Sequence, residues 1–227
     1  MQERKIQLKS GELTYFHAGS GRPLLYLHPA GGVRRSKVLQ GLAESFALYV
    51  PVIPGFEGTP FHEGVKTRQA LAGLAGEFMD QVIGARCDVM GWSFGGCVAL
   101  WLALERPPIV DHLVLECPAG LLSIAPKIKR VNRAILEHYD AQDGKDEALL
   151  ERVAAVEHTT LIIQGTEDGT TPAASAQLLK GRLKKAFLVY LWRASHDIEV
   201  DQPERVLALV RDFLERSDSF MVNRGNI

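Results

Sequence analysis

The feature that most constrains the fold of this chain is a regular alternation of short apolar runs with longer amphipathic stretches. Each run is a nearly continuous series of Leu and β-branched residues, as in strands buried on both faces of a parallel sheet. The runs are 24–28, 47–53, 87–92, 112–116, 160–164 and 186–192. Segments with helical spacing lie between most of them, at 33–45, 67–83, 94–105, 172–183 and 203–216. The pattern predicts an α/β fold, a mostly parallel sheet with helices on both faces.

Two more strands are expected at the N-terminus. Arg4–Lys9 and Leu13–His17 alternate in polarity and are separated by Ser10-Gly11-Glu12. Because Gly11 permits a tight turn, the two segments should pair as an antiparallel hairpin. With the six apolar runs they make an eight-stranded sheet.

The bulk properties exclude several classes of protein. At 227 residues the chain fits one domain, 1–227, and its net charge of -1 lacks the basic excess that nucleic acid demands. No apolar stretch approaches the roughly 20 residues of a membrane span, and no secretory leader is visible at the N-terminus. Cys87, Cys97 and Cys117 show no C-x-x-C spacing, so neither disulfides nor a metal site is expected. These features favour a cytoplasmic protein.

Two segments depart from the strand–helix rhythm. The charged, helical segment 123–157 is either a crossover elaborated into two helices or a short lid over a site. As a lid, it would turn an apolar underside toward the site and its basic residues toward water. The proposed underside includes Leu121, Leu122, Ile124, Ile128, Val131, Ile135 and Leu136, and the basic residues are Lys127, Lys129, Arg130 and Arg133. Residues 217–227 are polar and aperiodic and predict a loose tail.

A candidate nucleophile lies in Gly91-Trp92-Ser93-Phe94-Gly95, which follows an apolar strand and begins a helical pattern. This context suits a strained strand-to-helix turn that lifts the hydroxyl of Ser93 clear of the sheet. Glycines two residues before and after the serine let the backbone segments approach closely. The turn also aims a helix N-terminus at the reacting centre, where the N–H of Phe94 can stabilise an oxyanion.

At this point the sequence resembles the α/β-hydrolase superfamily, since residues 91–96 look like the G-x-S-x-G-G motif of its small esterases. His28-Pro29-Ala30-Gly31-Gly32 is similar to the family's H-G-x-G loop, which implies that Ala30 donates the second oxyanion N–H, with Gly31 as the alternative. Pro29 replaces the usual glycine and has no N–H to donate. His28 itself is expected to brace this loop.

The resemblance also implies an acid and a base. Gly165-Thr166-Glu167-Asp168 with Pro172 four residues later is similar to the family's acid motif, so Asp168 is the expected acid and its neighbour Glu167 the alternative. His196 follows the last predicted strand, where the family keeps its histidine. The order Ser93, Asp168, His196 matches the order of these groups in this fold.

These residues predict hydrolysis of carboxylic esters of short to medium chain through an acyl-enzyme on Ser93, with no cofactor and no metal. The same three groups also serve thioesters, amides, carbon–carbon bonds beside a carbonyl and cofactor-free peracid formation, and some proteins of this fold only bind ligands. Trp92 directly precedes Ser93, and this chain resembles in that respect the small methyl-ester esterases of acyl-carrier-protein pathways, which have a tryptophan before the serine. The expected partner is a small ester, and the oligomeric state is left open. The candidates for substrate contact are Gly31, Trp92, Leu121, Leu122 and Ile198.

Overall fold

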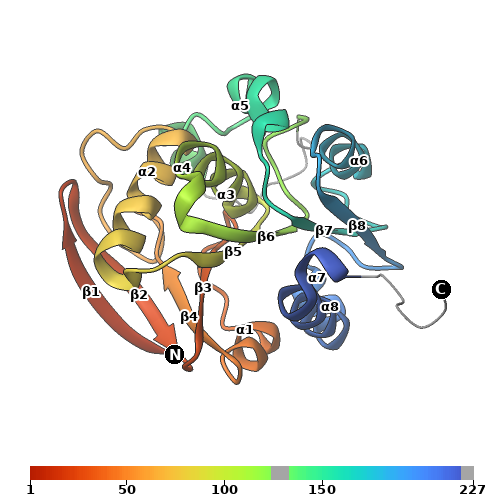
Figure 1. Ribbon diagram of the computed structural model, residues 1–227. Helices are drawn as coiled ribbons and strands as arrows, with labels where there is room; N and C mark the ends of the chain where they lie inside the picture. Colours follow the sequence, from red (N-terminus) through yellow and green to blue (C-terminus); the bar gives the residue numbers. More distant parts are fainter. Residues whose placement is uncertain (124–132, 221–227) are drawn as a thin grey trace.

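A single eight-stranded sheet forms the centre of the molecule (Figure 1), with the strands in the order β1-β2-β4-β3-β5-β6-β7-β8. The computed structural model describes residues 1–123 and 133–220. The strands are β1 (Gln2–Leu8), β2 (Gly11–Ala18), β3 (Arg22–Leu27), β4 (Phe46–Pro51), β5 (Cys87–Trp92), β6 (Val110–Glu116), β7 (Thr160–Gly165) and β8 (Ala186–Leu191). The expected eight-stranded α/β architecture is confirmed.

Antiparallel pairing is confined to one edge of the sheet. β1 pairs antiparallel with β2 through the two-residue turn Lys9-Ser10, which leads into Gly11, and β2 pairs antiparallel with β4. All other neighbouring strands, from β4 through β3 to β8, are parallel. The carboxyl ends of the parallel strands therefore lie along one edge of the sheet, which is where open α/β sheets bind ligands.

Helices cover both faces of the sheet (Figure 1). One face carries α1 (Lys37–Leu42), α7 (Ile198–Asp201) and α8 (Pro203–Arg216). The other carries α2 (Arg68–Phe78), α3 (Phe94–Glu105), α4 (Arg133–His138), α5 (Glu147–Arg152) and α6 (Ala173–Arg182). Within residues 1–123 and 133–220, none of these helices has the length and apolar character needed to cross a bilayer.

Helix ends differ from the predicted ones where capping side chains decide them. α1 begins only at Lys37, because the side chain of Ser36 accepts a hydrogen bond from the N–H of Leu39, so residues 33–36 are not helical. α2 continues as a π-helical turn, Met79–Ile83, and ends at Gly84 with a φ of 65°. The short helix α7 was not expected.

The segment between β6 and β7 contains α4 and α5, in line with a crossover elaborated into two helices. Asp146 caps α5 by accepting from the N–H of Leu149, pairs with Arg68 Nε at 3.1 Å and accepts from Trp101 Nε1 at 2.8 Å. α5 is thus fastened to α2 and α3. Ile135 and Leu136 are buried and Arg133 is exposed, as a lid would require. The other residues assigned to the lid's two faces, Ile124, Lys127, Ile128, Lys129, Arg130 and Val131, lie outside the described residues.

The prediction of a loose tail is wrong at its first residues. Ser217–Ser219 form a 3-10 turn, and Phe220 is fully buried. Its ring packs edge-on against Phe187 of β8 and Phe213 of α8, with centroid distances of 5.2 and 5.5 Å. One aromatic residue in a polar stretch has no periodicity, which is why the pattern did not reveal this docking. Residues 221–227 lie outside the described part of the chain.

Candidate active site

Ser93 occupies a strained turn between β5 and α3. Its φ of 53° and ψ of -112° are unfavourable for a residue with a side chain, a type of strain that clusters at functional sites. A Cβ at Gly91 would lie 2.5 Å from the carbonyl oxygen of Gly95, and one at Gly95 would lie 2.0 Å from that of Leu27. Both glycines are therefore required by backbone contact, as the predicted turn demands.

Backbone hydrogen bonds to the neighbouring strand hold this turn. The N–H of Ser93 donates to the carbonyl of Glu116 at 2.8 Å, and the N–H of Ala119 donates to the carbonyl of Ser93 at 3.0 Å. The Ser93 hydroxyl does not cap α3, and among the described residues it makes no hydrogen bond to His196. Phe94, the first residue of α3, has an N–H with no partner inside the helix, so this donor is available at the helix N-terminus directly after Ser93.

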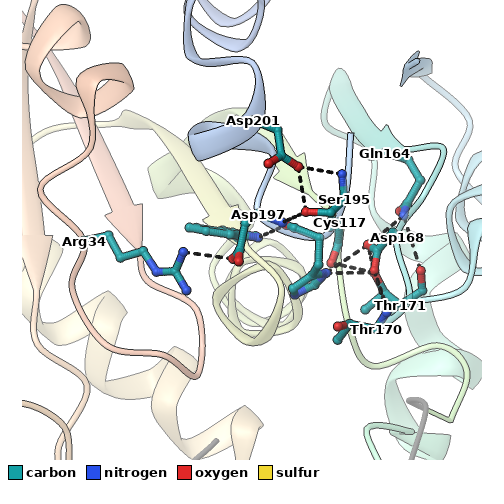
Figure 2. Close-up of polar contacts among 11 residues, drawn as sticks. Arg34, Cys117, Gln164, Asp168, Thr170, Thr171, Ser195, Asp197 and Asp201 are labelled. Carbon is teal, nitrogen blue, oxygen red and sulfur yellow. Dashed lines mark hydrogen bonds and ion pairs between the residues drawn. The ribbon is translucent and has the colours of Figure 1, made fainter. Parts of the chain in front are cut away.

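His196 and Asp168 form a hydrogen-bonded pair after β8 and β7. His196 Nδ1 lies 2.9 Å from Asp168 Oδ2, and the carboxylate is almost wholly buried at 1% exposure. The N–H groups of Thr170 and Thr171 donate to Oδ1, while the Thr171 hydroxyl and Gln164 Nε2 donate to Oδ2 (Figure 2). Glu167 is exposed and has no contact with His196 among the described residues. The structure therefore pairs the predicted histidine with Asp168.

The surroundings of Asp168 keep it ionised. Burial acts to raise the pKa of this carboxyl, but the hydrogen bond and charge of His196, together with the donors of Thr170 and Thr171, outweigh burial and lower the pKa to about 2. A permanent carboxylate at Nδ1 holds the imidazole proton there and leaves Nε2 free to accept one. Thr171 and Gln164 were missed by sequence reasoning, because a threonine and a glutamine near a strand end carry no distinctive pattern.

The loop that carries His196 is fixed from three sides. Trp92 Nε1 donates to the carbonyl of His196 at 3.1 Å. The N–H and hydroxyl of Ser195 donate to Asp201 Oδ2 at 2.7 and 2.6 Å. Arg34 pairs with Asp197 at 2.9 Å (Figure 2), and its guanidinium lies over the Trp92 ring at 4.8 Å. Trp92, predicted as a substrate contact, is fully buried and instead braces the histidine loop.

His28 braces the loop after β3, as expected. It is fully buried, its Nδ1 lies 2.8 Å from the carbonyl oxygen of Pro29, and its Nε2 accepts from the N–H of Ile53 at 2.9 Å. Burial lowers the pKa of His28 to about 4, so the ring is neutral and donates from Nδ1. The N–H of Gly32 turns back to Pro29 at 3.0 Å, which leaves Ala30 half-buried and Gly31 exposed at the tip of the turn.

The remaining residues predicted to contact substrate differ in accessibility. Leu121 and Ile198 have no exposed surface, because Leu121 belongs to the hydrophobic core and Ile198 begins the buried side of α7. In this structure neither offers a surface to a ligand from solvent. Leu122 is half-buried and Gly31 is exposed, so both remain open to contact.

Two clusters contain ligand types that metals use. Cys117, Asp168 and His196 place one ligand atom each within 4.8 Å of one another, but the atoms of Asp168 and His196 are already joined by their own hydrogen bond. Asp88, Asp111 and His112 lie at the opposite end of the strands, where Arg22 and Arg86 pair with the two aspartates at 2.8 and 3.0 Å. In both clusters, carboxylate atoms are already engaged in hydrogen bonds or ion pairs with other side chains.

Comparison with known proteins supports this assignment of the fold. No model of a known protein family matches the chain. A pimeloyl-[acyl-carrier protein] methyl ester esterase of Neisseria meningitidis serogroup B is 28% identical, over 72% of this chain and 80% of that protein. A 2-hydroxy-6-oxo-2,4-heptadienoate hydrolase of Pseudomonas putida is 26% identical, over 94% of this chain and 97% of that protein.

A solved structure extends the likeness to three dimensions. A serine hydrolase of Cycloclasticus zankles superposes with a TM-score of 0.81 at 17% identity, over 98% of this chain and 99% of that one. The alignment with the heptadienoate hydrolase spans 271 positions against the 227 residues of this chain, so that relative carries segments that this chain lacks. With its sheet order, its strand–turn–helix at Ser93 and this structural neighbour, the chain has the fold of the α/β hydrolases, and the two relatives above are an esterase and a hydrolase.

Proposed function

We propose that this protein is a serine hydrolase that cleaves small carboxylic esters of short to medium chain through an acyl-enzyme on Ser93. The observation that carries the proposal is the pairing of a buried carboxylate with His196, together with a serine held in a strained strand-to-helix turn. This is the arrangement that activates an otherwise weak hydroxyl nucleophile. The relatives, one named as a methyl ester esterase and one as a 2-hydroxy-6-oxo-2,4-heptadienoate hydrolase, support the broader class.

In the first half of the reaction, Ser93 Oγ attacks the ester carbonyl as His196 Nε2 takes up its proton. The hydroxyl–imidazole hydrogen bond forms with substrate bound, as such contacts often tighten only in the complex. Asp168, ionised and hydrogen-bonded to Nδ1, stabilises the imidazolium. His196 then protonates the departing alcohol, and the acyl group stays on Ser93.

In the second half, water takes the place of the alcohol. His196 removes a proton from the water as it attacks the acyl-enzyme, and the acid leaves with Ser93 restored. In both halves the N–H groups of Phe94 and Ala30 hold the tetrahedral oxyanion, and each such donor is typically worth about 3 kcal/mol of barrier. This chemistry needs neither metal nor organic cofactor.

Aromatic side chains next to Phe94 support a limited substrate size. Tyr139, which follows α4, lies with its ring centroid 6.0 Å from that of Phe94 and donates its hydroxyl to the carbonyl of Pro54 at 2.7 Å. Phe56 approaches Phe94 at 6.4 Å. Because Phe94 directly follows Ser93, these packed rings lie close to the nucleophile, and we take them to favour a modest acyl group. Cys87, Cys97 and Cys117 are buried free thiols, which supports a reducing compartment such as the cytoplasm.

A second candidate is hydrolysis of a carbon–carbon bond beside a carbonyl, which is favoured by the relative of that activity aligned over 94% of this chain. The same three groups would serve it. A panel of p-nitrophenyl esters, acyl thioesters and vinylogous 1,5-diketones, assayed with one preparation, separates the candidates by the substrate with the highest kcat/KM.

The decisive experiment on the shared mechanism is covalent labelling. A fluorophosphonate should modify the protein once, at Ser93, with mass spectrometry locating the adduct. Ser93→Ala should abolish labelling and ester hydrolysis, whereas Ser195→Ala, at a serine tied to Asp201, should leave the label on Ser93. Labelling at another serine, or full activity in Ser93→Ala, would exclude Ser93 as the nucleophile. No labelling together with no hydrolysis would favour a ligand-binding protein.

A further inference from the structure

Two glutamates meet inside the protein behind the Ser93 turn. Glu116 ends β6 and is 0% exposed, and Glu199 in α7 is 2% exposed. Their carboxyl groups lie within hydrogen-bonding reach of each other. The position has no role in the chemistry described above, yet burying two carboxyl groups together is costly unless something compensates.

The sheet register shows how close this pair is to the site. Tyr26 of β3 is paired with Met90, and Trp92, two residues further along β5, is paired with Glu116. Because side chains alternate along a strand, Tyr26, Trp92 and Glu116 point to the same face, the one that α7 covers. The backbone carbonyl of Glu116 also accepts the N–H of Ser93.

The hydrogen bonds of the pair indicate where a proton must be. Neither oxygen of Glu116 accepts a hydrogen bond from any N–H or hydroxyl group of the described residues. Glu199 Oε1 accepts from the Tyr26 hydroxyl at 3.1 Å. A carboxylate without donors would be strongly unfavourable in this interior, whereas a protonated Glu116 can donate to Glu199.

The charged and titratable groups around the pair favour the same assignment. Burial, and then the charge of Glu199, raise the pKa of Glu116 well above its ordinary value. Burial also raises the pKa of Glu199, while Ser36, Glu116, Tyr26 and Arg34 oppose that rise. Burial raises the pKa of both Cys117 and Tyr26, helped by the charge of Asp168 at Cys117 and by that of Glu199 at Tyr26, so both stay neutral beside the pair.

We propose that Glu116 and Glu199 share one proton at neutral pH, and that this carboxyl pair positions His196 by fastening α7 to the strand behind Ser93. Glu199 lies three residues after His196, and the carbonyl of His196 accepts a hydrogen bond from Trp92 of β5. The pair is therefore a further point at which the histidine loop is tied to the elements that hold the nucleophile. Glu116 and Glu199 are positioning residues, since neither touches the reacting atoms.

The shared proton is tested by folding stability, which requires no assumption about the reaction. Between the ordinary pKa of a glutamate in the unfolded chain and the raised pKa in the fold, the native protein holds one more proton than the unfolded chain, so stability falls as pH rises. Glu116→Gln keeps a donor toward Glu199 but cannot titrate. In urea unfolding from pH 5 to 8, the unfolding constant of the wild type relative to Glu116→Gln should rise about tenfold per pH unit.

Glu63→Gln is the matched control, because Glu63 is exposed and its replacement also removes one carboxylate. The same ratio measured against this variant should stay constant over this range. A constant ratio for Glu116→Gln as well would overturn the shared proton.

The positioning role is tested by activity and by the imidazole itself. Glu199→Leu, which removes the tie, should lower kcat by about 10-fold to 100-fold with KM changed less than about threefold, while Glu116→Gln should stay within about threefold of the wild type in kcat. The 15N signals of the His196 ring should shift in Glu199→Leu and not in Glu116→Gln. Unchanged ring signals in Glu199→Leu, or equal damage from both variants, would overturn the role. If the wild type hydrolyses no ester, the ring signals and the stability series still decide this inference separately.

Discussion

Replacing Asp168 by asparagine changes the charge beside His196 with almost no change of shape. Asp168 receives five hydrogen bonds, from Thr170 N–H, Thr171 N–H, the Thr171 hydroxyl, Gln164 Nε2 and His196 Nδ1. An amide has only one oxygen, so its NH2 group must face donors. Two fixed backbone N–H groups point at the Oδ1 position, and we therefore expect the amide oxygen there and the NH2 group toward His196.

The magnitude follows from this orientation. An NH2 group opposite Nδ1 forces the imidazole to accept at Nδ1 and to carry its proton on Nε2, where it can no longer accept the proton of Ser93. The same substitution in a serine protease triad costs about 10⁴ in turnover, which corresponds to about 5 kcal/mol at 1.36 kcal/mol per tenfold. We expect Asp168→Asn to lower kcat by a factor of this order with little change in KM.

The assay compares kcat for p-nitrophenyl acetate in Asp168→Asn, in Glu167→Gln and in the wild type. Glu167 is exposed, so its amide variant should change kcat by less than about threefold while altering net charge equally. Nitrogen-15 spectra of the His196 ring report the tautomer directly. Equal and mild losses in the two variants, or a proton that remains on Nδ1 in Asp168→Asn, would refute the reasoning.

The other predictions concern the turn, a buried histidine and the substrate. Gly95→Ala should destabilise the fold by more than about 3 kcal/mol in urea unfolding, because its Cβ would meet the Leu27 carbonyl at 2.0 Å. The control Gly73→Ala in α2, with nothing within 4 Å of the added Cβ, should stabilise the fold by up to about 1 kcal/mol. Equal effects of the two variants would show that the backbone of the turn can shift to accept a side chain. Burial lowers the pKa of His28 to about 4, from 6.5 in an unfolded chain, so below pH 6.5 the unfolded chain takes up a proton that the native protein does not. As pH falls from 6.5 to 4, the free energy of unfolding of the wild type should therefore drop by about 3 kcal/mol relative to that of His28→Gln. A constant difference between the two would argue against a neutral His28. Initial rates on p-nitrophenyl esters from acetate to palmitate should rise a few-fold per carbon and then stop, at about 0.8 kcal/mol per buried methylene; a steady rise through palmitate would contradict a short pocket.

The strands and the long helices could be predicted because their signals are local. β5 and α3 begin and end at the predicted residues, since a buried apolar run is followed at once by the glycine-flanked turn. α7 was missed because four residues are too few to show a helical period. The start of α1 depended on one capping hydroxyl, that of Ser36, which a window of apolar spacing does not detect.

The site could be predicted only as far as motifs reach. Ser93 and His196 stand in recognisable contexts, but the selection of Asp168 over Glu167 as the partner of His196 depends on which side chain the loop after β7 turns inward. Trp92 was expected to meet substrate because it precedes the serine. Its place in the alternation of β5 instead directs its side chain to the face of the sheet where it donates to the carbonyl of His196. Glu116 and Glu199 are far apart in the chain, so no local pattern could have brought them together.

In the chain between β6 and β7, backbone hydrogen bonds join Gly120 to Gly144 and Asp146, and we call this junction the base of the segment. The N–H of Gly120 donates to Gly144 at 2.9 Å, and the N–H of Asp146 donates back to Gly120 at 2.8 Å. Residues after this base are constrained by the buried pair of Asp146 with Arg68, whose disruption typically costs about 3–5 kcal/mol. Between two fixed ends, lengthening the chain costs only about 0.6 kcal/mol per doubling. Evolution can therefore enlarge or exchange this stretch by insertion between residues 121 and 143 without disturbing the sheet that holds the reacting groups.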